Sequence, residues 1–193
     1  MKYFWVSIVL FAIVGTASAT TTTFYGTTGV DVITVGRAYN DGGTLIYMAC
    51  INGSWDFGNA VTGSSDTVTV YGYAGSDTIR VRDVNDIFAC GVDGKWFYRM
   101  DRSYSCPGTI ALYGGTGNDV IAGAQCAEQI YGEAGADTLG GAGGNDSIYG
   151  GTENDCIEDT TLNTLICGDG TDKFTDDANW KDCETRVTFC PLP

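Results

Sequence analysis

The sequence predicts an all-β fold in which short strands stack on one another in a linear array. The first observation is a glycine-rich phrase that returns along the chain. Internal repeats of this kind are typical of solenoids, in which each unit packs only against its neighbours. The second is composition, with 28 glycines but only 3 prolines among 193 residues. Glycine permits tight turns, and scarce proline leaves backbone N–H groups able to pair in sheets.

The charge balance excludes several classes of function. The chain has 24 acidic and 10 basic residues, no histidine and a formal net charge of -14. Its hydrophobic content of 44% is enough for a core, so we expect the acids on a folded surface. Such a polyanion repels nucleic acid and anionic lipid and attracts cations or basic partners. We therefore expect no nucleic-acid binding and no histidine-based catalysis.

The first 19 residues predict export. Residues 1–19 combine an early lysine, an apolar run and a small-residue end, the pattern of a cleavable secretory signal, and we expect cleavage between Ala19 and Thr20. The alternative is a membrane anchor, but the apolar run of about 12 residues is shorter than the ~20 that span a bilayer. No later segment is long and apolar enough to span. We predict a secreted, extracellular protein whose eight cysteines form up to four disulfides.

The repeated phrase has a fixed internal pattern. It contains a glycine, a second glycine three residues later, an acid five later and a branched apolar residue seven later. From Gly114 the first positions follow every nine residues, with a degenerate unit at Gly123 and Glu153 in place of the second glycine in the unit at Gly150. The copies are YGTTGVDVI at 25–33, YGYAGSDTI at 71–79, YGGTGNDVI at 113–121, YGEAGADTL at 131–139, GAGGNDSIY at 141–149 and GGTENDCIE at 150–158.

These nonapeptides resemble the repeats-in-toxin (RTX) calcium-binding family, whose motif is G-G-x-G-x-D-x-U-x with U a large aliphatic residue. Residues 114–122 match it fully. The resemblance implies a right-handed parallel β-roll, or β-solenoid, in which each nonapeptide is a calcium-binding turn followed by a short strand and two nonapeptides make one coil. To this roll we add inserted β-hairpins and a disulfide-tied C-terminal cap. The cleavable leader and eight cysteines depart from the usual family pattern.

The alternation of side chains along a strand predicts a thin core made of two rows. One residue of each short strand points inward and its neighbours point outward. The first expected row is Ile121, Leu139, Ile157 and Phe174, and the second is Ile110, Ile130, Ile148 and Ile166.

If two nonapeptides make one coil, turns eighteen residues apart lie on the same edge of the roll. Stacked carboxylates repel one another unless a cation lies between them, and oxygen ligands without histidine favour Ca²⁺. The alternative is that each aspartate only hydrogen-bonds its own turn. On the opposite edge we expect a poorer set, Glu128, Asp146 and Thr164, with Asp66 a weak candidate. The predicted calcium-site residues are Asp119, Asp137, Asp155, Asp172, Asp146, Gly115, Gly117, Glu133, Gly135, Gly151, Asp31 and Asp77.

The N-terminal half reads as coils of the same roll lengthened by insertions. Residues 46–57 and 87–98 each contain Ala-Cys, an Asn-Gly or Asp-Gly turn and a tryptophan, which predicts two β-hairpins. We accordingly divide the chain into a signal peptide (1–19), elaborated N-terminal coils (20–112), the nonapeptide roll (113–174) and the cap (175–193).

Stacking also predicts cysteine pairs. Cys106 and Cys126 each stand four residues before an isoleucine expected in the core, and Cys50 and Cys90 share one context in the two hairpins. Equivalent residues of adjacent coils lie close enough for a disulfide, so we expect Cys106–Cys126 and Cys50–Cys90. The other four, which we expect to tie down the cap in an undetermined pairing, are Cys156, Cys167, Cys183 and Cys190.

A tyrosine precedes the first glycine of five repeats, at positions 25, 71, 113, 131 and 149, and should face outward. The rings could form a platform for sugars, joined by Trp55, Trp96 and Trp180, or could simply stack along the sheet. We therefore predict a secreted calcium-binding structural or interaction module of the cell surface or matrix, with a carbohydrate-binding module as the alternative. A polysaccharide or cell-surface component and a second copy of the chain are candidate partners. We predict no enzyme, because the carboxylates are already assigned to turns.

Overall fold

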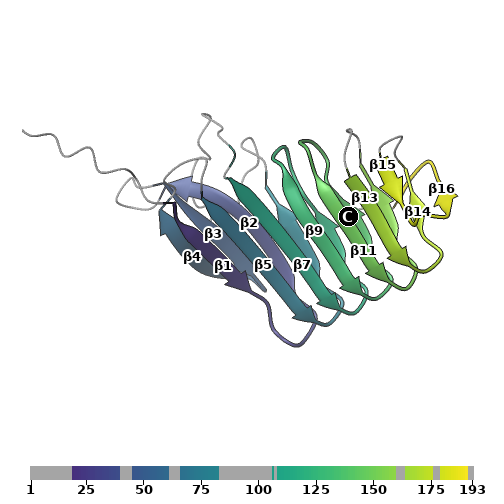
Figure 1. Ribbon diagram of the computed structural model, residues 1–193. Helices are drawn as coiled ribbons and strands as arrows, with labels where there is room; N and C mark the ends of the chain where they lie inside the picture. Colours follow the sequence, from purple (N-terminus) through teal and green to yellow (C-terminus); the bar gives the residue numbers. More distant parts are fainter. Residues whose placement is uncertain are drawn as a thin grey trace, which may run out of the picture.

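The structure is a computed structural model that describes residues 19–39, 45–60, 66–82, 106, 108–159, 164–175 and 179–190. Within these ranges every regular element is a β-strand, and the strands form two sheets that lie face to face along the molecule (Figure 1). None of these residues forms an apolar helix long enough to cross a membrane.

The first sheet has seven strands, all parallel, and successive strands in the sheet are separated in sequence by a strand of the other sheet or by an insertion. This arrangement is that of a solenoid, because each coil contributes one strand to each sheet. In spatial order the strands are β1 (Thr21–Tyr25), β5 (Thr67–Ala74), β7 (Thr109–Thr116), β9 (Glu128–Ala134), β11 (Ser147–Thr152), β13 (Thr164–Asp169) and β15 (Asn179–Lys181).

The second sheet has nine strands, of which seven are parallel neighbours and two form an antiparallel extension at the N-terminal end. Its spatial order is β16 (Thr185–Arg186), β14 (Lys173–Phe174), β12 (Cys156–Glu158), β10 (Thr138–Gly140), β8 (Val120–Ala122), β6 (Thr78–Val81), β2 (Val32–Tyr39), β3 (Leu45–Ile51) and β4 (Ser54–Ala60). The predicted all-β roll with an inserted hairpin is confirmed. Both sheets continue across the expected divisions at 112/113 and 174/175, and those boundaries stay predictions.

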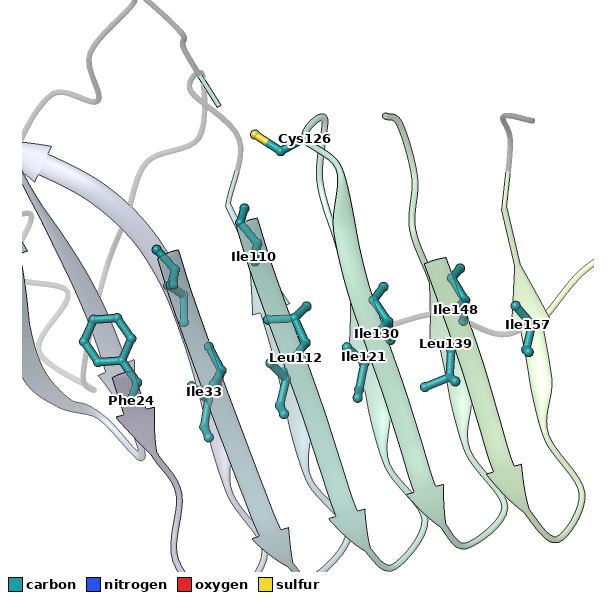
Figure 2. Close-up of a cluster of buried hydrophobic side chains, with 14 of the residues drawn as sticks. Phe24, Ile33, Ile110, Leu112, Ile121, Cys126, Ile130, Leu139, Ile148 and Ile157 are labelled. Carbon is teal, nitrogen blue, oxygen red and sulfur yellow. The ribbon is translucent and has the colours of Figure 1, made fainter. Parts of the chain in front are cut away.

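The core lies between the sheets as two rows of fully buried side chains (Figure 2). The first row is confirmed by the pairing of Ile121, Leu139, Ile157 and Phe174 on adjacent strands. It extends toward the N-terminus through Ile79 and Ile33. Because each coil buries only one or two residues per strand, each strand depends on the coils beside it for its burial.

The prediction of the second row is wrong at both of its ends. Ile130 pairs with Leu112 and Ile148 with Leu165, so these leucines continue the row in place of Ile110 and Ile166. Ile110 also points inward, two residues from Leu112, but pairs with Glu128. The last coil has 17 residues where its neighbour has 18, and a shift of one residue reverses which side chain faces inward. Ile166 therefore lies in line with the outward Tyr149.

The hairpin predicted at 46–57 is β3 and β4, joined by Asn52-Gly53 with φ of 49° and 80°. Positive φ at both central residues is typical of the type I′ turn that Asn-Gly favours. The hairpin extends the second sheet, and Gly58 of β4 packs over Phe24 of β1. The second predicted hairpin, at 87–98, lies outside the described residues.

Three disulfides link described cysteines. Cys106–Cys126 is confirmed, with Cα atoms 5.5 Å apart. Its predicted register is wrong by two residues, because Ile110 pairs with Glu128 and not with Ile130. The cap is tied by Cys156–Cys190 and Cys167–Cys183, a pairing that the sequence left open. The expected partner of Cys50, Cys90, lies outside the described residues.

The outward tyrosines form the predicted ladder. Tyr25, Tyr71, Tyr113, Tyr131 and Tyr149 follow one another across the first sheet with centroids 4.7–5.7 Å apart and planes within 18° of parallel. Trp180 does not join them. It pairs in register with the inward-pointing Leu165 and packs on Phe174, with ring centroids 5.2 Å apart. Trp96 and the side chain of Trp55 lie outside the described part of the chain.

The observed second row of the core predicts which substitutions should destabilise the fold most. Leu112→Ala should lower the free energy of unfolding by about 2–5 kcal/mol, because the leucine is fully buried between two coils. Ile166→Ala, which truncates the residue first expected in the row, should cost less than half as much. Urea unfolding of both variants, with disulfides intact, measures the difference. Equal losses would contradict the observed register.

Candidate metal centre

Six aspartates line one edge of the roll, where the chain passes from the first sheet to the second. Each aspartate lies in the turn that follows a strand of the first sheet, one residue before a strand of the second sheet begins. All six side chains are at most 2% exposed. The members of this row, called the aspartate edge below, are Asp31, Asp77, Asp119, Asp137, Asp155 and Asp172.

The aspartates are linked from coil to coil by hydrogen bonds. The backbone N–H of Asp119 donates to Oδ1 of Asp137 at 2.8 Å, and that of Asp137 donates to Oδ1 of Asp155 at 2.9 Å. The same bond joins Asp31 to Asp77, Asp77 to Asp119, and Asp155 to Asp172, at 2.7–2.8 Å. One carboxylate oxygen of each aspartate after Asp31 therefore fixes the spacing between turns.

Both ends of the aspartate edge are closed by residues that the sequence analysis missed. At the N-terminal end, the side-chain amide of Asn52 donates to Oδ1 of Asp31, in the place of an N–H from a preceding coil. At the C-terminal end, the N–H of Asp172 donates to Oε2 of Glu184 at 2.7 Å. Neither residue belongs to a nonapeptide. The hairpin turn and the cap bring them to the edge.

The second carboxylate oxygen has a different environment. Among the described residues, Oδ2 is buried and has no hydrogen-bond partner in Asp77, Asp119, Asp137, Asp155 and Asp172. Asp31 differs, because its Oδ2 accepts the N–H and hydroxyl of Thr27 within its own turn. Asp31 thus hydrogen-bonds its own turn, as the alternative expected, and also accepts the amide of Asn52. A buried carboxylate oxygen without a donor is costly, and this cost recurs at five successive turns.

A second oxygen approaches the Oδ2 atoms of Asp31, Asp77, Asp119, Asp137 and Asp155. A Cβ atom placed on Gly132 would overlap both Oδ2 of Asp137 and the carbonyl oxygen of Gly150 in the next coil. The same pair, an aspartate Oδ2 and a carbonyl oxygen of the next coil, lies over Gly26, Gly72, Gly114 and Gly150. Two electron-rich oxygens from adjacent coils therefore converge where only glycine leaves room for them.

Burial shifts the titration of these groups. Desolvation raises the pKa of Asp119 to about 6 and that of Asp137 and Asp155 to about 7, although the hydrogen bond from the neighbouring backbone opposes the rise. Desolvation also raises the pKa of Asp77 and Asp172. Neighbouring carboxylates add to the increase in every case. In the absence of a cation, the fold disfavours the charged form of these aspartates.

The four predicted glycines of the site lie in the same turns, and all of them have positive φ. These are Gly115, Gly117, Gly135 and Gly151, with φ of 113–135°. A Cβ atom at any of them would collide with a carbonyl oxygen of the preceding coil, so glycine is needed for close stacking of the turns. Glu133 stands in the row of Gly115 and Gly151 with φ of 76° and is exposed. Its charge adds to the rise in the pKa of Asp119.

The opposite edge carries fewer acids. The N–H of Glu128 donates to Oδ1 of Asp146 at 2.8 Å, which repeats the linkage of the aspartate edge once. Thr164 contributes its N–H to the carbonyl of Asp146. Asp66 lies apart from this pair, and its carboxylate accepts hydrogen bonds from the Thr20 N–H and the Tyr47 hydroxyl. Burial raises the pKa of Asp146 to about 6, and the charge of Asp159 adds to the rise.

The donor set fits a hard divalent cation such as Ca²⁺. Within the described ranges no three acidic, histidine or cysteine side chains gather into a preformed cluster. The available ligands are instead single carboxylate oxygens together with backbone carbonyls of the turns, which are groups that calcium accepts. The donorless Oδ2 atoms are the observation that calls for such an ion.

Comparison with known families agrees with this geometry. The family model of the RTX calcium-binding nonapeptide repeat, in four copies, matches residues 56–88, 111–139 and 127–157. Neither a curated protein nor a solved structure matches the chain significantly. The matched residues include Asp77, Asp119, Asp137 and Asp155, and RTX nonapeptide repeats bind Ca²⁺. The chain thus carries RTX calcium-binding nonapeptide repeats folded as a β-roll.

Proposed function

We propose that this protein is a secreted structural or interaction module, of the cell surface or matrix, whose coils are fastened together by calcium along the aspartate edge. The observation that carries the proposal is the donorless Oδ2 facing a carbonyl oxygen of the next coil. An ion between two turns would contact both coils at once. Calcium binding would then be part of the folding free energy.

The proposed ligands are the acids of the aspartate edge and carbonyl oxygens of its glycine-rich turns. Asp119, Asp137 and Asp155 have the strongest support, because their turns match the nonapeptide model and their Oδ2 atoms are buried without donors. Asp77 has the same buried Oδ2 beside a carbonyl oxygen, and Asp172 shares the buried Oδ2 without a donor among the described residues. Asp31 has the weakest support, since Thr27 already satisfies its Oδ2. On the opposite edge, Asp146 is the proposed ligand.

The extracellular assignment is supported by the disulfides. Three are present among the described cysteines, and such bonds persist in oxidising compartments. The leader at 1–19 lies outside the described residues, apart from Ala19. The matched repeats are calcium-binding structural units, and we keep the prediction that the chain is not an enzyme.

The tyrosine ladder does not favour the carbohydrate-binding alternative. A sugar ring stacks on an exposed aromatic face, but Tyr71, Tyr113 and Tyr131 are each covered on both faces by neighbouring rings. The contacts instead stabilise the sheet along its length. The ladder therefore supports a structural role for this face.

Calcium should stabilise the fold strongly. Titration of Ca²⁺ into chelator-treated protein should raise the melting temperature, since an ion at a hundredfold excess over its Kd adds about 2.7 kcal/mol per site. Circular dichroism should report an increase in ordered β structure at the same time. If neither signal responds to calcium, the proposed function is wrong.

Asp137→Asn should remove the charge of a proposed calcium ligand while keeping the hydrogen bond between the coils. The amide oxygen can still accept the N–H of Asp119, but the substitution removes the charge that we assign to calcium. We expect the calcium-dependent rise in melting temperature to shrink and the calcium-free stability to stay equal or increase, because a buried unpaired charge is gone. The matched control is Asp56→Asn, at an exposed position on β4. A calcium response equal to that of the control would remove Asp137 from the site.

The raised pKa values of Asp119, Asp137 and Asp155 predict opposite pH dependences with and without calcium. A carboxyl whose pKa is higher in the folded state stabilises the fold when protonated, and this contribution is lost as the pH rises through 6 to 7. The calcium-free melting temperature should therefore fall from about pH 4, where these carboxyls ionise in the unfolded chain, to about pH 7, and level off above that. The rise in melting temperature that calcium causes should become larger over the same pH range, because protons compete with the ion for the carboxylates. A calcium-free melting temperature that rises with pH would contradict this account.

A further inference from the structure

The C-terminal cap places one more carboxylate in line with the aspartate edge. Glu184 lies directly after the turn that follows β15, and its Oε2 accepts the N–H of Asp172 at 2.7 Å. This is the bond that each aspartate of the edge makes with the next. Glu184 therefore occupies the position of a further aspartate, although it lies beyond the residues matched by the nonapeptide model.

The length of the last turn explains why the residue is a glutamate. Tyr149, Ile166 and Lys181 are aligned across β11, β13 and β15, and Lys173 is aligned with Thr185 at the start of the following strands. Asp172 comes six residues after Ile166, whereas Glu184 comes only three after Lys181. The shorter turn omits the glycine-rich segment. The additional methylene of glutamate compensates by extending the carboxylate toward Asp172.

The position also has the feature that marks the other turns. Asp172 is 0% exposed, and its Oδ2 is buried without a hydrogen-bond partner among the described residues. The acidic charges of Glu184 and Asp169 act on it and help to raise its pKa, although burial contributes most. The neighbouring base Lys181 pairs with a different acid, because its Nζ lies 3.3 Å from Oδ2 of Asp182.

Two disulfides hold this arrangement in place. Cys183, next to Glu184, is bonded to Cys167 in β13 of the preceding coil. Cys190 is bonded to Cys156 one coil earlier, and its N–H donates to Glu158. The covalent links bring the cap into register with the roll but leave the carboxylates of Asp172 and Glu184 adjacent.

We infer that Asp172 and Glu184 form a terminal calcium site, in which the bound ion fastens the disulfide-tied cap to the last coil. The inference rests on the proposed function of the aspartate edge and extends it to a residue outside the nonapeptides. Calcium would then protect the open end of the core, where Trp180 packs on Phe174.

Glu184→Gln in the full, oxidised chain tests the site. The amide oxygen still accepts the N–H of Asp172, so the variant removes the charge and keeps the hydrogen bond. The control is Asp182→Asn, which makes the same charge change two residues away at an exposed position whose φ of 57° asparagine tolerates. Equilibrium dialysis counts bound Ca²⁺, and hydrogen exchange reports calcium-dependent protection at 179–190.

We expect Glu184→Gln to bind one Ca²⁺ fewer than wild type and to lose calcium-dependent protection of the cap, while the turns at Asp119 and Asp137 still respond. Asp182→Asn should behave as wild type. Glu184→Asp, which keeps the charge but shortens its reach, should weaken the last site. Unchanged calcium binding in Glu184→Gln, or an equal loss in the control, would overturn the terminal site alone. Absence of calcium binding in wild type would overturn the proposed function as well.

Discussion

The structure depends on a conflict within the turns of Asp77, Asp119, Asp137 and Asp155. One carboxylate oxygen of each accepts the N–H of the preceding coil and so sets the register between coils. The other oxygen is buried beside a carbonyl oxygen and has no donor among the described residues. The hydrogen bonds favour stacking, and the facing oxygens oppose it. The proposed divalent cation would resolve the conflict, since it would convert a repulsive pair of oxygens into two ligands.

The remaining architecture supports this edge. Each coil contributes only a thin slice of core, so no coil is stable by itself, and both ends of the array must be closed. The β3–β4 hairpin closes one end and supplies Asn52 to the first aspartate. The disulfide-tied cap closes the other and supplies Glu184 to the last. The stacked tyrosines reinforce the outer face of the first sheet.

The sequence predicted most of the features that obey the nine-residue repeat. The phase of nine placed Asp119, Asp137 and Asp155 on one edge and Ile121, Leu139 and Ile157 in one row. One prediction failed where the phase changes, because the coil before β13 is one residue shorter and puts Leu165 inside in place of Ile166. Another failed on β7, where both Ile110 and Leu112 point inward: the prediction took Ile110, although the eighteen-residue spacing from Ile130 leads to Leu112. Asn52 and Glu184 could not be found from spacing, because tertiary contacts alone bring them to the edge.

The most direct test of the central claim is an anomalous difference map from crystals grown with calcium. Our account predicts peaks between successive turns of the aspartate edge, each in contact with Oδ2 of an aspartate and with a carbonyl oxygen of the adjacent coil. A map without peaks at Asp119, Asp137 and Asp155, in which those Oδ2 atoms are instead hydrogen-bonded to water, would contradict it.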